Sequence, residues 1–157
     1  MLKFRIIVVD RTRSPFLKEG ELFYRKRLGN YAQSEWVEVK PARITKGRPA
    51  EEVLAAEGEA IARRLNAADY LVALDRTGDP YDSVELAGWF QRLSVEVGGW
   101  VTFVIGGPLG LSRETVTRAQ KVLSLSRLTL THEMCRLVLL EQIYRAMTIL
   151  RGEKYHK

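Results

Sequence analysis

Apolar and polar positions repeat with two different periods along this chain, and the order of the two periods predicts an α/β fold. Short apolar runs rich in β-branched residues predict strands at residues 3–9, 36–39, 70–74, 100–105 and 121–125. Longer stretches with one apolar helical face predict helices at residues 15–28, 49–65, 83–97, a short one from 112, and 132–151. Strands that alternate with helices favour a three-layer sandwich around a mostly parallel sheet.

Residues that begin and end helices support these boundaries. Ser14-Pro15 places a capping side chain and a proline at the start of the first helix, and Gly29-Asn30 follows its end. Asp82 or Ser83 is expected to cap the third helix. Residues 40–49 and 76–80 contain Gly and Pro and are expected to be loops.

Length and composition are typical of a single globular domain. The 157 residues, 46% of them apolar, suffice for one domain, 1–157, with a real core. No apolar run is long enough to span a membrane, and we expect a soluble, cytoplasmic protein without a signal peptide. With Cys135 as the only cysteine, beside two histidines, neither an internal disulfide nor a clustered metal site is expected.

Positive charge is concentrated in the two outer thirds of the chain. The formal charge is +6, yet residues 51–100 carry ten acidic and only four basic side chains. Basic residues of the first third form three clusters, at Arg11 and Arg13, at 25–27 and at 40–48. Clustered Lys and Arg in Gly/Pro loops suit a polyanion, because each neutralised phosphate releases counterions. The charge favours nucleic acid over a membrane surface, although it is also typical of a solvated surface.

Two loops that follow apolar strands could hold a ligand. Residues 106–110 (Gly-Gly-Pro-Leu-Gly) follow one predicted strand, and residues 75–78 (Asp-Arg-Thr-Gly) follow another. Ligands of open α/β sheets bind beyond the carboxyl ends of the strands, where glycine lets the backbone approach closely. The glycine run matches neither a dinucleotide fingerprint nor a P-loop, and by itself is more typical of a tight turn. Asp75 is expected to be a helix cap or an ion-pair partner.

The alternation of polar residues changes phase inside residues 123–132. Serines occupy two even positions in this segment, whereas threonines occupy two odd ones. A single strand keeps one phase, so the chain is expected to leave the sheet at Arg127-Leu128. We interpret the segment as a buried loop or a pocket wall, and a bulged edge strand fits the pattern equally well.

The last predicted helix carries an unusually wide apolar face. Its two neighbouring stripes consist of Leu137, Leu140, Tyr144 and Met147, and of Leu139, Ile143, Ala146 and Leu150. So wide a face is buried on more than one side, which favours a two-fold subunit interface over burial within one subunit. The tail that follows, residues 151–157, offers Tyr and His beside two lysines for RNA contacts.

Several of these motifs resemble the small SPOUT-class methyltransferases. The resemblance is carried by residues 103–111, by 123–130 followed by His132, by 136–146 and by the ending 151–157. Together these segments are similar to the methyltransferase H family, which acts on large-subunit ribosomal RNA, and the likeness covers the whole chain. The chain departs from this family at Thr131, where many relatives carry proline before the histidine.

The resemblance implies a fold, a cofactor and a substrate. It implies a C-terminal trefoil knot, S-adenosylmethionine bound in that knot, and a homodimer. It implies methylation of N3 of a pseudouridine in helix 69 of 23S rRNA on the assembled 70S ribosome. By position, the expected cofactor contacts are Leu74, Gly106, Leu125, Ser126, Arg127, Leu128, Thr129 and Leu130. The residues expected near the target base are His132, Arg136, Tyr144, Tyr155 and His156, with the tail completing the partner subunit's site.

The implied reaction must remove the N3 proton, and His132 is the candidate base by residue type. Arg136 would hold phosphate or stabilise the developing anion. No metal is required, because the sulfonium methyl is already activated. Three other functions stay open: a SPOUT enzyme acting on tRNA or a ribose 2′-oxygen, a non-catalytic RNA-binding assembly factor, and, on the glycine loop alone, a phosphate-binding α/β protein.

Overall fold

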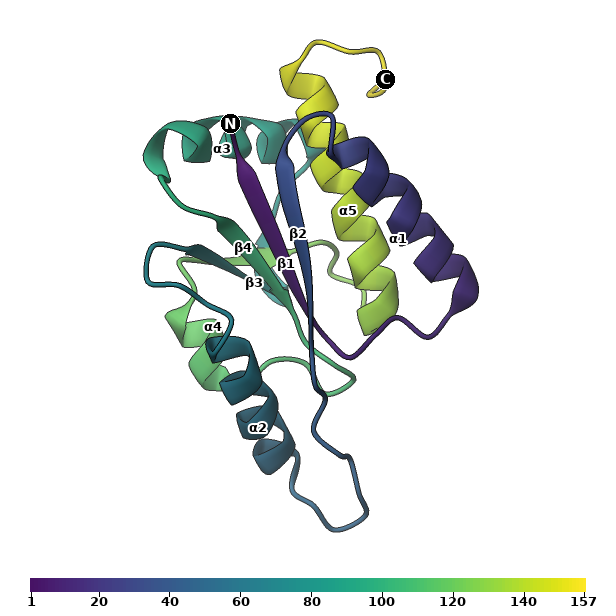
Figure 1. The fold of residues 1–157 in the computed structure, drawn as a ribbon, viewed down its shortest axis with the longest axis vertical. Helices are drawn as coiled ribbons and strands as arrows, with labels where there is room; N and C mark the ends of the chain where they lie inside the picture. Colours follow the sequence, from purple (N-terminus) through teal and green to yellow (C-terminus); the bar gives the residue numbers. More distant parts are fainter.

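Five parallel strands form the central sheet of the computed structural model, which describes residues 1–157 (Figure 1). The strands are β1 (Lys3–Val9), β2 (Gln33–Val39), β3 (Tyr70–Pro80), β4 (Val101–Ile105) and β5 (Lys121–Ser124). They lie in the order β2-β1-β4-β3-β5, and every paired neighbour is parallel. The predicted parallel sheet is confirmed. All five strands therefore end at one edge, which we call the carboxyl edge.

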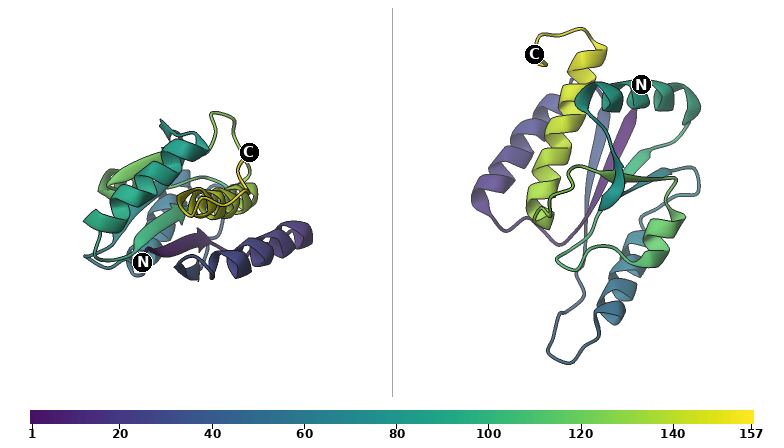
Figure 2. Two further views of the ribbon diagram at one scale, coloured as in Figure 1. Left: turned by 90° about the horizontal axis from the view of Figure 1, so that it is seen from above. Right: turned by 180° about the vertical axis from the view of Figure 1, so that it is seen from behind.

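Five helices cover the two faces of this sheet. They are α1 (Pro15–Leu28), α2 (Ala50–Ala62), α3 (Ser83–Glu96), α4 (Arg113–Arg118) and α5 (His132–Leu150). On one face α5 packs between α1 and α3, and α2 and α4 cover the other face (Figures 1 and 2). This arrangement confirms the three-layer sandwich. None of the helices combines the length and the apolar character that crossing a bilayer requires.

The two central strands are buried because helices cover both of their faces. Every side chain of β4 is buried, and so is every side chain of β1 after Lys3. On the face below α3 and α5, Phe4, Phe90 and Phe103 pack with ring centroids 5.1 to 6.2 Å apart. Strands buried on both sides consist of nearly continuous apolar residues, so the sequence pattern predicted β1 and β4 clearly.

The wide apolar face of α5 is buried within the chain. Leu139, Leu140, Ile143 and Ala146 have no exposed surface, because they pack between α1, α3 and the sheet. For the six of its eight residues that are buried within one chain, the predicted subunit interface is wrong, whereas Leu137 is half-buried and Leu150 exposed. A helix packed between two helices and a sheet needs apolar residues on more than one stripe.

β3 extends farther than its apolar run predicts. Residues 76–80 were expected to be a loop but continue the strand after a bulge. As a result, Leu123 of β5 pairs with both Leu74 and Asp79. Gly78 permits this close approach, because a Cβ there would lie 2.6 Å from a backbone oxygen of β5. The bulge keeps the end of β3 beside β5 at the carboxyl edge.

The remaining predicted elements are confirmed within a few residues of their expected ends. The largest differences are the start of β2, three residues earlier than expected, and the end of α2 at Ala62 instead of 65. Asp82 caps α3 in a capping box with Glu85, and Ser112 caps α4. The trefoil knot implied by the family resemblance stays a prediction.

Candidate active site

A pocket of about 660 Å³ opens at the carboxyl edge of the sheet. It is lined by residues 74–76 at the bulge of β3, by 105–111 after β4, by most of 123–132 after β5, and by Cys135. Parallel sheets bind their ligands at this edge, and the volume falls within the range of small-molecule sites. The interpretation of the 123–132 segment as a pocket wall is confirmed.

The glycine loop, residues 106–110, forms one wall of the pocket and requires glycine at two positions. The N–H of Gly110 donates to the carbonyl oxygen of Gly107 at 3.0 Å, which closes a tight turn. A Cβ on Gly106 would lie 2.3 Å from the carbonyl oxygen of Gly110, and Gly110 itself has a φ of +85°. Side chains at either position would therefore open the turn and reshape the pocket.

The loop of residues 125–131 forms the opposite wall and leaves backbone donors free. The N–H groups of Thr129 and Leu130 make no hydrogen bond to another backbone group of the chain. Polar backbone groups in folded proteins are normally paired, so these two donors are available to a ligand. Leu125 and Leu130 are half-buried in the same wall and give it an apolar surface.

His132 begins α5 and lines the pocket with a half-buried imidazole. Burial lowers the pKa of His132 below its ordinary value of 6.5, and the positive charge of Arg136 one turn along lowers it further. The imidazole is therefore neutral near pH 7 and able to accept a proton. Cys135 lies beside it, but burial raises the pKa of the thiol, which keeps it protonated.

Thr131 caps α5 and holds the loop where the pocket meets the helix. Its hydroxyl accepts the N–H of Met134 at 3.1 Å. Its φ is −61°, which is the value that proline would impose. Threonine at this position therefore keeps the backbone direction of the proline that many relatives carry and adds a capping hydrogen bond.

Arg136 does not reach the pocket, so the prediction that it contacts the substrate is wrong. Its side chain is fully buried, where it donates to the hydroxyl of Thr12 at 2.9 Å and to the carbonyl oxygen of Val9 at 2.7 Å. Glu21, also buried, accepts a hydrogen bond from the same hydroxyl and offsets the positive charge. Arg136 thus joins α5 to the end of β1.

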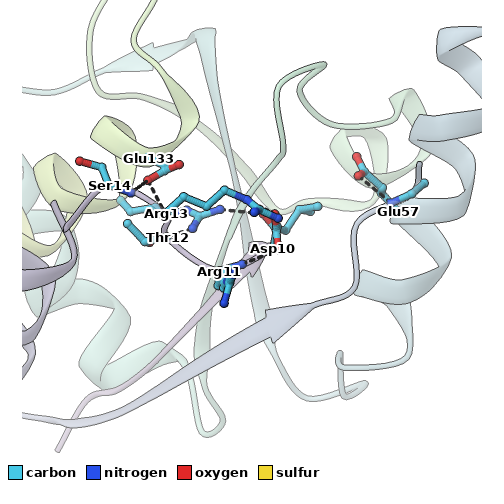
Figure 3. A network of polar contacts seen from close by, with 10 residues as sticks. Asp10, Arg11, Thr12, Arg13, Ser14, Glu57 and Glu133 are labelled. Atoms are coloured by element: carbon cyan, nitrogen blue, oxygen red, sulfur yellow. Dashed lines mark hydrogen bonds and ion pairs between the residues drawn. The ribbon is translucent and has the colours of Figure 1, made fainter. Parts of the chain in front are cut away.

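The loop of residues 10–14, between β1 and α1, is fixed against the first turn of α5 (Figure 3). The carboxylate of Glu133 accepts the N–H groups of Arg13 at 2.9 Å and Ser14 at 3.0 Å. Asp10 has a φ of 68° and binds the guanidinium of Arg13 at 2.9 Å. The sequence offered no sign of this clamp, because its partners lie about 120 residues apart.

Three further predicted site residues lie away from the pocket. Arg127 belongs to the 125–131 loop, but its side chain is exposed and does not line the cavity. Tyr155 and His156 follow the far end of α5, whose 19 residues make a helix about 28 Å long. Neither of them lines the pocket, so a single chain does not bring the tail together with His132.

The tail packs against the end of its own helix instead. The hydroxyl of Tyr155 donates to Glu141 at 3.0 Å, and its ring meets that of Tyr144 edge-on at 4.8 Å. The guanidinium of Arg145 lies over the ring of Tyr155. Burial and hydrogen bonding raise the pKa of Tyr155, so its hydroxyl stays protonated at neutral pH. Tyr144 accordingly supports the tail and does not line the pocket.

Comparison with known proteins identifies the class to which this fold and pocket belong. Residues 2–156 match the family model described as "Predicted SPOUT methyltransferase". The chain therefore belongs to the SPOUT methyltransferase family, and its methyl donor is S-adenosylmethionine. The resemblance noted in the sequence is confirmed at this level.

Individual relatives carry a more particular name. The protein named "Ribosomal RNA large subunit methyltransferase H" from Anaeromyxobacter sp. (strain Fw109-5) is 44% identical over 156 residues, covering 99% of this chain and 100% of the relative. The protein of the same name from Carboxydothermus hydrogenoformans is 40% identical, covering 99% and 100%. A probable methyltransferase from Bordetella pertussis Tohama I superposes with a TM-score of 0.57 at 19% identity, covering 93% of this chain and 96% of that one, which supports the fold.

The pocket fits the cofactor. The free N–H groups of Thr129 and Leu130 suit the acceptor nitrogens of an adenine ring, and the apolar wall suits its faces. The predicted cofactor contacts that line the pocket are Leu74, Gly106, Leu125, Ser126, Leu128, Thr129 and Leu130. Sequence reasoning did not assign Cys135 to it. Cys135 could have been found, because it lies three residues after His132 and so on the same helical face.

Proposed function

We propose that this chain, acting as a homodimer, methylates N3 of a pseudouridine in helix 69 of 23S rRNA on the assembled 70S ribosome. The observation that carries the proposal is a neutral His132 at the wall of a cofactor-sized pocket. The names of the relatives support large-subunit rRNA as the substrate. The particular nucleotide and the ribosomal context are what the family resemblance implies.

The two walls of the pocket offer different contacts to the cofactor. The glycine loop brings its backbone close to the ligand, and Thr129 and Leu130 offer their backbone N–H groups. Bound S-adenosylmethionine supplies a methyl group that is already activated as a sulfonium. What remains for the protein is alignment of the target nitrogen and removal of its proton, and alignment alone contributes a large part of such catalysis.

His132 is placed to take that proton. Its imidazole lies in the pocket wall, half-buried and uncharged at neutral pH. A general base must be within hydrogen-bond reach of the proton that it accepts, and a base with a pKa near the working pH is most effective. The buried positive charge of Arg136, one helical turn along, lowers the pKa of His132 and so favours the neutral imidazole.

The exposed surface of α1 supports the homodimer. Phe16, Leu22 and Phe23 expose 68%, 54% and 49% of their surface on a helix that packs beside α5. Adjacent exposed apolar side chains are typical of a protein interface. Because the tail cannot reach its own pocket, Tyr155 and His156 would act at the pocket of the second copy.

The proposal is tested by transfer of labelled methyl groups from S-adenosylmethionine. The substrates are 70S ribosomes lacking the modification, deproteinised 23S rRNA and tRNA. We expect label on ribosomes alone, recovered after digestion as 3-methylpseudouridine. Label on tRNA or on naked RNA would overturn the substrate and leave the methyltransferase class intact. Sedimentation of the same protein at micromolar concentration should give twice the 17.9 kDa mass of one chain.

A further inference from the structure

The three basic clusters, which the sequence alone does not distinguish, lie in different parts of the structure. The 25–27 cluster ends α1 at the edge opposite the pocket (Figure 1). Its two arginines stack on rings of the same chain, Arg25 over Trp36 and Arg27 over Phe23. These cations are partly satisfied within the protein and lie far from the pocket of their own chain.

The basic loop, residues 40–48 between β2 and α2, lies at the other edge. It leaves the carboxyl end of β2 and projects beyond the start of α2 (Figure 1). Lys40, Arg43 and Lys46 are exposed, and none of them forms an ion pair. The loop contains no acidic residue. Arg48 lies 3.7 Å from Glu52, and the other three cations are unpaired and open to solvent at the edge that holds the pocket.

The basic loop is held in shape by its own hydrogen bonds. The guanidinium of Arg48 donates to the carbonyl oxygen of Arg43 at 2.9 Å. The backbone N–H of Arg48 donates to the carbonyl oxygen of Thr45 at 3.1 Å. Gly47, with a φ of +88°, permits this turn. A loop ordered before binding loses little conformational entropy when a partner binds.

Glu57 of α2 connects the base of this loop to the pocket. Its buried carboxylate accepts the N–H of Ala42 at 3.1 Å and lies under the glycine loop, 3.5 Å from the place of a Cβ on Gly107 (Figure 3). The same carboxylate therefore supports the basic loop and the wall of the cofactor pocket. The backbone at the base of the basic loop is thereby held beside the pocket.

We propose that the basic loop binds backbone phosphates of the ribosomal RNA that carries the target base, while the pocket receives the base. This inference rests on the proposed function. Phosphate contacts set the register of a protein on nucleic acid without reading its sequence. Arg11, on the neighbouring 10–14 loop, is a further exposed cation without an ion pair at this edge. The basic loop thus gives the chain a phosphate-binding surface beside its pocket.

The test compares two triple variants with the same net charge. The first, Lys40→Gln, Arg43→Gln and Lys46→Gln, removes the unpaired cations of the basic loop. The second, Lys3→Gln, Arg64→Gln and Arg92→Gln, removes three exposed cations away from the pocket edge. Binding to unmodified 70S ribosomes is measured from low to moderate salt, with cofactor affinity as the control for folding. We expect the loop variant to bind about 10-fold or more weaker at about 0.1 M salt, and its salt slope to fall by about 2 to 3.

Several outcomes would overturn the inference. If both triple variants weaken binding equally, long-range charge explains the effect and the loop has no special role. If the parent methylates ribosomes and the loop variant binds as the parent does, the inference fails and the proposed function stands. If the parent binds no ribosomal RNA, both fail. If the loop variant loses only binding to phosphatidylglycerol vesicles, the loop serves a membrane surface instead.

Discussion

The two ends of α5 differ in how their polar groups are used. At its first turn His132 lines a pocket, and free N–H groups of the adjoining loop, residues 125–131, are available to a ligand. From the middle of the helix onward, Glu141 binds both Arg145 and Tyr155, so these polar groups are paired within the chain. Chemistry therefore belongs to the end of the helix where the fold leaves polar groups without partners. The satisfied end is suited to holding the tail.

Substitution of His132 tests the chemical role of the first turn of α5. We expect His132→Asn to lower methyl-transfer turnover about 10²- to 10⁴-fold, the usual contribution of a general base, while cofactor affinity stays unchanged. Because burial lowers the pKa of His132, the rate of the parent should fall only when the pH drops below 6.5. Single-turnover kinetics against pH measures both effects. An unchanged turnover would remove His132 from this role.

Two arginines of α5 are expected to differ in how much they contribute to the free energy of unfolding. Arg136 is fully buried, whereas Arg145 remains 24% exposed in its pair with Glu141. Arg136→Met leaves the buried Glu21 without its cation and should lower the free energy of unfolding by about 3 to 5 kcal/mol. Arg145→Met should cost about 1 kcal/mol or less. Denaturant titration of both variants gives the difference, and equal losses would contradict the assigned roles.

A pair of glycines sharpens the account of the pocket. A Cβ on Gly106 would meet the carbonyl oxygen of Gly110, whereas Gly98 has open space around it. Gly106→Ala should displace the glycine loop and lower methyl transfer about 10²-fold, as a misplacement of about 1 Å does. Gly98→Ala should leave the rate unchanged. Calorimetry of cofactor binding to both variants checks that the loss begins at the pocket.

The smallest expected effect concerns the pH dependence of stability. Burial raises the pKa of Glu57 above 4.5, so the folded chain keeps this proton to higher pH than the unfolded chain. The stabilisation is full below pH 4.5 and is lost as the pH rises through the folded pKa. Glu57→Gln still accepts the N–H of Ala42 and should lose less stability than the parent between pH 4.5 and 7. Exposed Glu51→Gln is the matched control and should follow the parent, and parallel curves for all three proteins would contradict the prediction.

Local patterns predicted most of the fold because this sheet is covered on both faces. The apolar runs of β1 and β4 and the caps at Asp82 and Ser112 depend on neighbours within a few residues. Residues 76–80 were missed as a strand, because their pairing with β5 depends on a bulge and on the small size of Gly78. Such pairing joins segments about forty residues apart and leaves no local period.

The pocket was predictable in outline and not in detail. The glycine run and the phase change after β5 indicated two of its walls, since both are local departures from a regular pattern. The role of Arg136 was not predictable, because the same residue type serves equally as a substrate contact or a buried cross-link. Its partners, Thr12 and Val9, lie more than 120 residues away in the chain.

The layers, the parallel sheet, the family and the edge at which a ligand binds could all be predicted from the sequence, because each depends on short-range patterns or on motifs. Which polar groups are free depends on the three-dimensional fold. It buried Arg136, packed Tyr155 against Glu141 and Tyr144 outside the pocket, and left Lys40, Arg43 and Lys46 of the basic loop without ion pairs. Whether a charged group is satisfied depends on what lies across the fold from it, and that distance in space has no counterpart along the chain.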